Sequence, residues 1–445
     1  VCTVARCISV ATTGDRCVLA EGTYPGSELG GSGYVIQTGE LVDLVCSGDK
    51  GTCPFQPAGS NISGVRLNSP TAGGEINLTR LTIDGSGTTP LDQCFWYSDA
   101  TGHYTVNSTD NECKEAAIYG HRVVGNEVTL NSLRDTLTAS TAVSPNALAQ
   151  TASASWAEGA VNISGANVTI DRYDGSATPV VLVDASDAGE SGSVTDSTFT
   201  IANDPATTAG FIDVIRAINV PGFTATGNTI TVTGANIGET GTNCSAVVCR
   251  QVRAIKSYSD AALTSANANL SGNIITIEAA SGIGVSVGDD GSGTGDTYSE
   301  YGTASRNTIT CVNGGTSTHG VGLFWSQRGV ASSNWVKGCG IGLLSKGQPT
   351  AGGLFTGNIL IDIAESYMLS KGSTAPKFIN NTLSVMNSDG TPVNIGVDGA
   401  IDSTNVTVVN NNICSSGGQP TNLLNTAASQ TILEATNNNW YGFTS

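Results

Sequence analysis

Three basic residues occupy similar points of three short apolar segments, and together they could act on an acidic sugar. They are Arg328 in LFWSQRG (323–329), Lys346 in LLSKG (343–347) and Lys371 in MLSKG (368–372). A row of cations can neutralise the carboxylate of a uronate, and a base can then remove the C5 proton of the ring. Tyr367 and His319 are the candidates to assist that proton transfer, which would be polysaccharide lyase chemistry.

A simpler interpretation is a ladder of solvated side chains at one turn of a repeat. In the lyase interpretation, Trp325 and Trp335 could stack on sugar rings. In the ladder interpretation they need no ligand. The sequence favours the ladder, because a chain with only 19 basic residues is a poor binder of polyanions.

Glycoside hydrolysis would need two carboxylates about 5 Å or about 6.5–9.5 Å apart. Asp362 and Glu365 are close in sequence, but residues three apart on a strand point to opposite faces. Asp84 and Asp213 are isolated along the chain. The sequence therefore offers no carboxylate pair for a hydrolase.

No cofactor is expected from the ligand-type residues. Asp289, Asp290 and Asp296 lie in the glycine-rich stretch GDDGSGTGDTYSE (288–300), where calcium is conceivable. Their spacing does not match an EF-hand, and a solvated loop is the preferred interpretation. The three histidines are far apart and none adjoins paired cysteines, so a zinc site is not expected.

Composition excludes several classes of function. The chain of 445 residues has 37 acidic and 19 basic residues, a net charge of −18, which argues against a nucleic-acid partner. No apolar run is long enough to span a membrane. Twelve cysteines without a CxxC pair indicate disulfide bonds in an oxidising, extracellular compartment, and a start at Val1 suggests a signal peptide removed or left out.

One phrase recurs along the chain: a small polar residue, usually Asn, followed by a β-branched run. It begins at Asn167, Ser197, Asn228, Asn273, Asn307, Asn334, Asn358, Asn381, Asn412 and Asn439. The last six intervals are 34, 27, 24, 23, 31 and 27 residues. A period in the twenties with two or three short strands per unit predicts a parallel β-solenoid. A β-sandwich would repeat every 8–12 residues without a fixed phrase.

The chain resembles the right-handed parallel β-helix proteins, the group that includes pectate-lyase-like and NosD-like repeats. The resemblance is carried by GDRCVLAEGTYPG (14–26), LTIDGSG (81–87), the Asn phrases, the GIGL element (340–343) and NNNWYG (437–442). It implies an all-β, single domain over residues 1–445, a disulfide-stapled solenoid of roughly fourteen coils that opens at 14–26. A disulfide-closed loop at 94–113 and an irregular insertion near 131–160 are expected to interrupt it.

The positions of the cysteines suggest local disulfide bonds and leave two cysteines without a partner in the same molecule. The expected pairs are Cys46–Cys53, Cys94–Cys113, Cys244–Cys249 and Cys311–Cys339. One of Cys2, Cys7 and Cys17 then remains, together with Cys414 near the other end of the chain. In a rod these two thiols cannot meet within one molecule, so Cys414 is expected to bond to Cys2 or Cys7 of another copy.

The leading expectation for function is therefore a secreted structural protein, a homopolymer that assembles head to tail into an extracellular or cell-surface fibre. No capping helix is visible in the sequence, and uncapped strand edges can pair with another chain. The alternative is a monomeric carbohydrate-active or carbohydrate-binding β-helix that uses the 320–372 face, with surface glycans as partners. A buried free thiol at Cys414, or trimmed chain ends, would remove the argument for a polymer.

Nine N-x-S/T sequons permit glycosylation of a secreted chain without demonstrating it. Their asparagines are Asn61, Asn77, Asn107, Asn162, Asn167, Asn243, Asn269, Asn380 and Asn405.

Overall fold

The computed structural model is an all-β parallel β-helix of about 15 coils, confirming the predicted fold class. Contacts divide the chain into two units, Val1–Asp204 and Pro205–Ser445, and each is described by itself. The structure describes residues 3–58, 63–70, 73–86, 91–98, 103–124, 127–139, 147–151, 159–173, 179–184, 190–203, 211–234, 251–259, 267–279, 281–288, 299–312, 317–324, 326–347, 352–385, 393–397, 403–415, 421–422 and 432–441.

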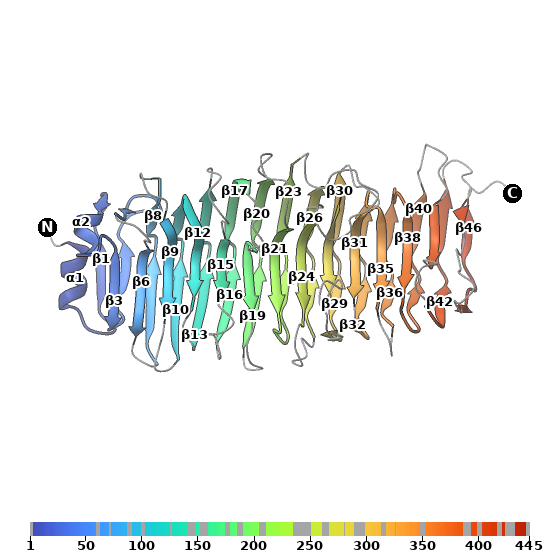
Figure 1. The fold of residues 1–445 in the computed structure, drawn as a ribbon, viewed down its shortest axis with the longest axis horizontal. Coiled ribbons are helices and arrows are strands. Elements are labelled where there is room, and N and C mark those ends of the chain that lie inside the picture. The colour runs from blue at the N-terminus through green and yellow to red at the C-terminus, as the bar shows by residue number, and fades with distance from the viewer. Residues whose placement is uncertain are drawn as a thin grey trace. The chain divides into compact units, whose positions relative to one another are not determined.

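In the first unit every coil contributes one strand to each of three parallel sheets, named A, B and C (Figure 1). Sheet A contains β1 (Arg16–Leu19), β4 (Asp43–Cys46), β7 (Glu75–Thr79), β10 (Tyr104–Thr109), β13 (Val128–Leu133), β16 (Ala160–Ser164) and β19 (Ser191–Thr195). Sheet B contains β2 (Tyr24–Pro25), β5 (Pro54–Gln56), β8 (Thr82–Asp84), β11 (Glu112–Lys114), β14 (Thr136–Ala139), β17 (Asn167–Tyr173) and β20 (Thr198–Asn203). Sheet C contains β3 (Val35–Gly39), β6 (Ser63–Pro70), β9 (Leu91–Ser98), β12 (Ala116–Val123), β15 (Ala147–Thr151) and β18 (Val181–Asp184).

The second unit repeats the same order. Sheet A contains β22 (Thr224–Thr226), β25 (Asn269–Ser271), β29 (Thr303–Ser305), β33 (Val330–Ser332), β36 (Leu354–Thr356), β39 (Lys377–Ile379), β42 (Val406–Val409) and β45 (Ile432–Glu434). Sheet B contains β23 (Thr229–Thr233), β26 (Ile274–Glu278), β30 (Thr308–Val312), β34 (Trp335–Lys337), β37 (Ile359–Ile361), β40 (Thr382–Val385), β43 (Asn412–Ser415) and β46 (Asn439–Tyr441). Sheet C contains β21 (Phe211–Ile218), β24 (Gln251–Tyr258), β27 (Ser281–Val287), β31 (Ser317–Phe324), β35 (Ile341–Lys346), β38 (Ser366–Lys371), β41 (Val393–Val397) and β44 (Thr421–Asn422), and β28 (Ser299–Glu300) pairs with β32 (Ser326–Gln327).

One helix precedes the first strand and a second helix follows the second strand, although no capping helix is evident in the sequence. Helix α1 (Val4–Val10) contacts β1 and β3, and α2 (Gly26–Leu29) follows β2 (Figure 1). The Thr3 hydroxyl accepts a hydrogen bond from Arg6 N–H and caps α1, and the Cys7–Cys17 disulfide ties α1 to β1. The first coil is therefore capped, which corrects the expectation of an exposed N-terminal strand edge.

The corner between sheets A and B has the same backbone conformation in each coil from β7 onward. One residue there adopts a left-handed conformation, such as Arg306 at φ 54° or Gly357 at φ 64°. The next residue points into the core, and in the second unit it is Asn eight times in succession. The eight are Asn228, Asn273, Asn307, Asn334, Asn358, Asn381, Asn411 and Asn438.

From Asn273 onward, each of these asparagines accepts hydrogen bonds from the corner asparagine of the preceding coil. The Oδ1 atom of Asn334 accepts hydrogen bonds from the Asn307 N–H at 3.0 Å and the Asn307 Nδ2 at 2.9 Å. The Asn334 Nδ2 donates to the Ala304 carbonyl at 2.9 Å. The repeat phrase predicted most of this ladder but placed its last two members one residue late. Asn412 and Asn439 lie on the outer face of sheet B, and the ladder uses Asn411 and Asn438 instead.

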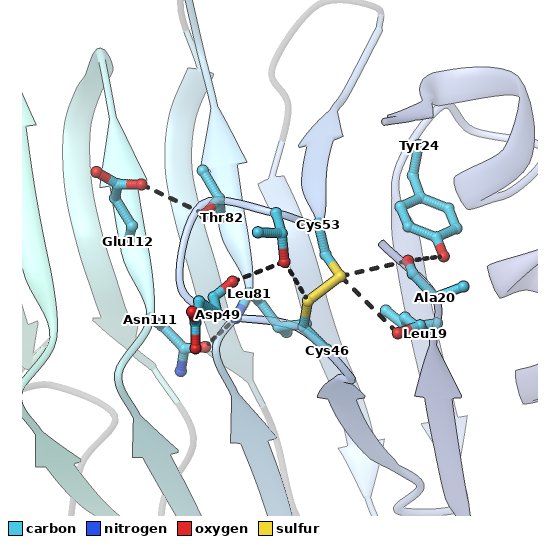
Figure 2. The surroundings of a disulfide bond; sticks show 11 residues. Leu19, Ala20, Tyr24, Cys46, Asp49, Cys53, Leu81, Thr82, Asn111 and Glu112 are labelled. Atoms are coloured by element: carbon cyan, nitrogen blue, oxygen red, sulfur yellow. Dashed lines mark hydrogen bonds between the residues drawn. A yellow bond between two sulfur atoms is a disulfide. The ribbon is translucent and has the colours of Figure 1, made fainter. Parts of the chain in front are cut away.

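The first unit fills the same corner position with varied residues, which are Leu81, Asn111, Asp135, Ala166 and Ser197. Asn111 accepts from Leu81 N–H, Asp135 from Asn111 N–H, and Ser197 from Ala166 N–H. Figure 2 shows the Leu81–Asn111 bond beside the Cys46–Cys53 disulfide. This variation explains why the Asn phrase fades in this part of the sequence.

The described parts of both expected interruptions form strands of the three sheets. Residues 94–113 are not a loop, because they include parts of β9 and β11 and all of β10. Residues 131–160 carry the end of β13, then β14 and β15, and the start of β16, in register with neighbouring coils. Parts of this second stretch, 140–146 and 152–158, lie outside the described residues.

Four intramolecular disulfide bonds join described cysteines, and three of them were expected from the sequence. They are Cys7–Cys17, Cys46–Cys53, Cys94–Cys113 and Cys311–Cys339. Cys7 is therefore not available for an intermolecular bond, contrary to one expectation, while Cys2, Cys244 and Cys249 lie outside the described residues. These disulfides indicate an oxidising compartment. No helix in the described ranges is long and apolar enough to cross a membrane.

The inner ladder predicts a sharp contrast between two asparagines. We expect Asn334→Ala to lower the free energy of unfolding by about 2–4 kcal/mol, because it leaves several buried backbone and amide groups without hydrogen-bond partners. Asn412→Ala, on the exposed outer face, should cost less than about 0.5 kcal/mol. Urea denaturation of both variants measures the difference, and equal losses would contradict a supporting role for the ladder.

Candidate functional site on the outer face of sheet C

Basic residues are concentrated on the strands of one sheet. The described strands of sheet C carry seven basic and three acidic residues, whereas sheet A has two basic and three acidic and sheet B three basic and four acidic. The basic residues of sheet C are Arg66, Arg122, Arg216, Arg253, Lys256, Lys346 and Lys371. Sheet C is therefore locally cationic in a chain whose net charge is −18.

In the first unit, Arg66, Trp96 and Arg122 lie at one register position on the adjacent strands β6, β9 and β12. The Arg66 guanidinium carbon lies 3.8 Å from the centre of the Trp96 ring. The Arg122 guanidinium carbon lies 4.4 Å from the ring centre of Tyr119, which is also on β12. These four residues, here called the Arg–Trp row, are all half-buried, so each presents part of its side chain to solvent.

Two N–H groups of the row have no hydrogen-bond acceptor among the described residues. They are the Nε of Arg66 and the Nε1 of Trp96, and both atoms are withdrawn from solvent. Arg66 also directs an Nη2 N–H toward the Asn68 Oδ1 at 3.5 Å. Buried donors in proteins normally have acceptors, so both N–H groups mark an unmet hydrogen-bonding requirement in the row.

In the second unit, a cluster of charged groups on sheet C is buried and joins neighbouring coils. Asp213 on β21 accepts two hydrogen bonds from Arg253 on β24 and one from Arg216 at 3.3 Å. Arg216 also donates to the Tyr258 hydroxyl, and the Lys256 ammonium lies 4.3 Å from the Tyr258 ring centre. Arg253, Lys256 and Tyr258 are only 5%, 1% and 6% exposed, so this cluster is positioned to hold coils together rather than to meet a ligand.

The predicted lyase residues are not assembled into one site. Lys346 and Lys371 are in register on β35 and β38, as their phrases predicted. Arg328, by contrast, is in the exposed turn before β33, where it donates to the Tyr301 hydroxyl. His319 is half-buried on sheet C, with its ring centre 6.5 Å from that of Phe324.

Tyr367 faces the core rather than the solvent. It is completely buried and donates a hydrogen bond to the Ser384 carbonyl at 2.8 Å. Burial raises the pKa of Tyr367 well above its ordinary value, so the phenolate that could act as a base is not populated near neutral pH. The tyrosine is therefore a structural residue, and it cannot serve as the predicted proton-transfer group.

The remaining predicted groups are scattered. Trp335 is half-buried on the outer face of sheet B, away from the lysines of sheet C, and Trp325 lies outside the described residues. Asp362 and Glu365 are exposed in the connection between β37 and β38, so the strand alternation used to separate them does not apply. Asp84 caps a turn by accepting from Ser86 N–H.

No group of three ligand-type side chains could hold a metal ion within the described ranges. The acidic residues Asp289, Asp290 and Asp296 lie outside those ranges.

A buried Tyr–His–Asp arrangement in the first unit is not an accessible catalytic site. The Tyr97 hydroxyl lies 2.8 Å from His121 Nδ1, and His121 Nε2 lies 3.2 Å from Asp135 Oδ2. Tyr97 is fully buried and the other two side chains are 2% exposed. Asp135 also occupies a corner-ladder position, which assigns the group to the core.

The sequon asparagines fall into two structural classes. Asn77, Asn107 and Asn162 are half-buried in an outer amide ladder on sheet A, where Asn107 Nδ2 donates to Asn77 Oδ1. Asn167, Asn269, Asn380 and Asn405 are exposed. Asn61 and Asn243 lie outside the described residues.

Nothing in the linear sequence marks Arg66, Trp96 and Arg122 as neighbours. They are separated by 30 and 26 residues, in the part of the chain where the Asn phrase is absent. An alignment of the segments VRL, FWY and HRV on their apolar flanking residues could have revealed that these three residues are neighbours.

Two bidentate Arg–Asp pairs allow burial to be tested as the source of stability. Arg253→Gln should cost about 3–5 kcal/mol of unfolding free energy, because it leaves the buried Asp213 carboxylate poorly compensated. Arg134→Gln breaks the equivalent exposed pair with Asp110 and should cost at most about 1 kcal/mol. Chemical denaturation compares the free energies of unfolding of the two variants. A loss for Arg253→Gln no larger than that for Arg134→Gln would refute the structural assignment of the cluster.

Comparison with known proteins gives the fold alone. No family model and no curated protein matches the chain. The Azotobacter vinelandii mannuronan C-5 epimerase AlgE6 A-module is similar with a TM-score of 0.30 and 12% identity, covering 96% of this chain and 91% of that one. The PL6 family alginate lyase AlyGC is similar with a TM-score of 0.23 and 10% identity, covering 98% and 79%. The strand order of the chain itself, with three parallel sheets, is that of the right-handed parallel β-helix fold that its sequence resembles.

Proposed function

We propose that this protein is an extracellular carbohydrate-binding β-helix whose sheet C face binds acidic polysaccharides. The observation that carries the proposal is the Arg–Trp row, which places the half-buried Arg66, Trp96 and Arg122 at one register position on sheet C. A uniform distribution of cations would favour no face, and the acidic remainder of the chain would repel a polyanion.

The Arg–Trp row is the accessible part of this face. Arg66 and Arg122 are two coils apart, about 10 Å at the usual strand spacing, with Trp96 between them. Guanidinium groups match carboxylates through paired hydrogen bonds, and the aromatic residues offer apolar contact to sugar rings. A uronate chain lying along the row would meet cation, aromatic ring and cation in turn.

Binding is favoured over catalysis because no described acid–base pair accompanies these cations at the surface. Tyr367 is buried, Arg328 lies in a separate turn, and Asp213, Arg253 and Lys256 are buried. The Lys346–Lys371 pair in the second unit is in register and extends the cationic character of the sheet without supplying a base.

The Arg–Trp row predicts selective loss of binding to a polyuronate. The double variant Arg66→Gln, Arg122→Gln should weaken binding of polygalacturonate roughly 10- to 100-fold, the loss expected for one or two charge-assisted hydrogen bonds. Isothermal titration calorimetry or affinity electrophoresis at fixed salt measures the change.

The matched control removes two exposed lysines from the other sheets. Lys337→Gln, Lys377→Gln changes the net charge equally and should leave the affinity within about twofold. Equal loss in both double variants would point to unspecific attraction. Wild-type protein that binds polygalacturonate no better than a neutral glucan would refute the proposal.

A head-to-tail fibre is the second candidate function, and Cys414 is the observation that favours it. Cys414 is the one free cysteine among those described, and it is half-exposed on β43. With Cys7 bonded to Cys17, the N-terminal candidate for a bond to Cys414 is Cys2.

Peptide mass spectrometry of native, unreduced protein tests that bond. A Cys414 peptide linked to a Cys2 peptide, in a species of twice the monomer mass that vanishes on reduction, is the expected result. A free thiol at Cys414 in the native material would remove the covalent fibre.

A further inference from the structure

The outer face of sheet B in the second unit repeats the same residue types over six adjacent coils. Strands β23, β26, β30, β34, β37 and β40 pair without a register shift, so their outward residues form two parallel columns. The first column contains Thr229, Ile274, Thr308, Trp335, Ile359 and Thr382. The second contains Thr231, Thr276, Thr310, Lys337, Ile361 and Ser384. These twelve residues, here called the Thr–Ile array, include nine threonines and isoleucines and one charged residue.

Every side chain of the Thr–Ile array reaches the surface. Ile274 is 54% exposed and Ile359 is 43% exposed, whereas the residues that follow them, Ile275 and Leu360, are completely buried. The six threonines are half-buried, and none of their hydroxyl groups hydrogen-bonds to a residue in the described ranges. Solvent water is therefore the partner of these hydroxyl groups, and the isoleucine side chains beside them are also in contact with water.

The array is periodic in two directions. Adjacent strands of a sheet lie about 4.8 Å apart, and residues two apart on one strand are separated by about 6.6 Å. A flexible polymer in solution or a globular protein does not repeat in two directions, whereas the surface of a crystal does. The oxygen atoms of hexagonal ice recur at spacings close to these two, and its water molecules can both donate to and accept from a threonine hydroxyl.

We propose that the Thr–Ile array binds ice. The threonine hydroxyls would hydrogen-bond to water molecules at lattice positions, and the methyl groups of threonine and isoleucine would order the water between them. Lys337 is the single charge of the array, in a chain with 37 acidic and 19 basic residues, so this face suits an uncharged ligand. A crystalline polysaccharide would instead need aromatic rings for contact to its sugar rings, and the array has one, Trp335.

An ice recrystallisation assay on the full chain tests the proposal. Wild type should inhibit recrystallisation, and Thr276→Tyr, which raises a ring above the array, should require roughly tenfold more protein for the same inhibition. Thr303→Tyr is the matched control, because it places the same ring at a half-buried threonine on the outer face of sheet A, and it should act like wild type. Lys337→Thr removes the charge and should require roughly twofold less protein, a gain that misfolding would not produce.

Three results would overturn ice binding by this face. They are wild type that does not inhibit recrystallisation, equal losses for Thr276→Tyr and Thr303→Tyr, and wild type that adsorbs to microcrystalline cellulose but is excluded from growing ice. Thr276→Tyr should bind polygalacturonate like wild type, because sheet C is not altered. Ice binding is thus tested independently of the binding of acidic polysaccharides.

Discussion

The corner between sheets A and B is the constraint on which the other features depend. A left-handed residue turns the chain, and the next residue points inward and hydrogen-bonds to the adjacent coil. At corners such as Asn307, the inward amide of the next coil satisfies a backbone N–H that would otherwise be buried and unpaired, at a cost of about 1–3 kcal/mol. Because the corner fixes where every coil turns, it also fixes the register of the strands that follow.

Because the register is fixed, residues at equivalent positions of successive coils lie in one column along a sheet. The residue types in each column determine the chemistry of that face. Inward columns carry apolar residues such as Ile309, Val336 and Leu360, while the outer column Arg66, Trp96 and Arg122 gathers charge and aromatic rings. Charges beyond about 8 Å are largely screened at physiological ionic strength. A ligand on sheet C would therefore respond to local cations more than to the net charge of −18.

The fold could be predicted from the sequence because the buried corner asparagine is an unusually strict requirement. Runs of three asparagines at 410–412 and 437–439 prevented its exact placement, since the phrase alone does not say which amide points inward. Residues 94–113 looked like a loop because the corner there uses Asn111 and Asp135 instead of the repeated phrase. The site could not be predicted: Tyr367 and Lys371 are close in sequence, yet only the coil geometry shows that Tyr367 faces the core.

Arginine footprinting with an α-dicarbonyl reagent, read by peptide mass spectrometry, tests the role of sheet C most directly. In the presence of polygalacturonate, modification of Arg66 and Arg122 should fall, while Arg16 on sheet A and Arg134 at a corner should react as in its absence. Equal protection of all four residues, or protection of Arg16 and Arg134 alone, would contradict the assignment of polysaccharide binding to this face.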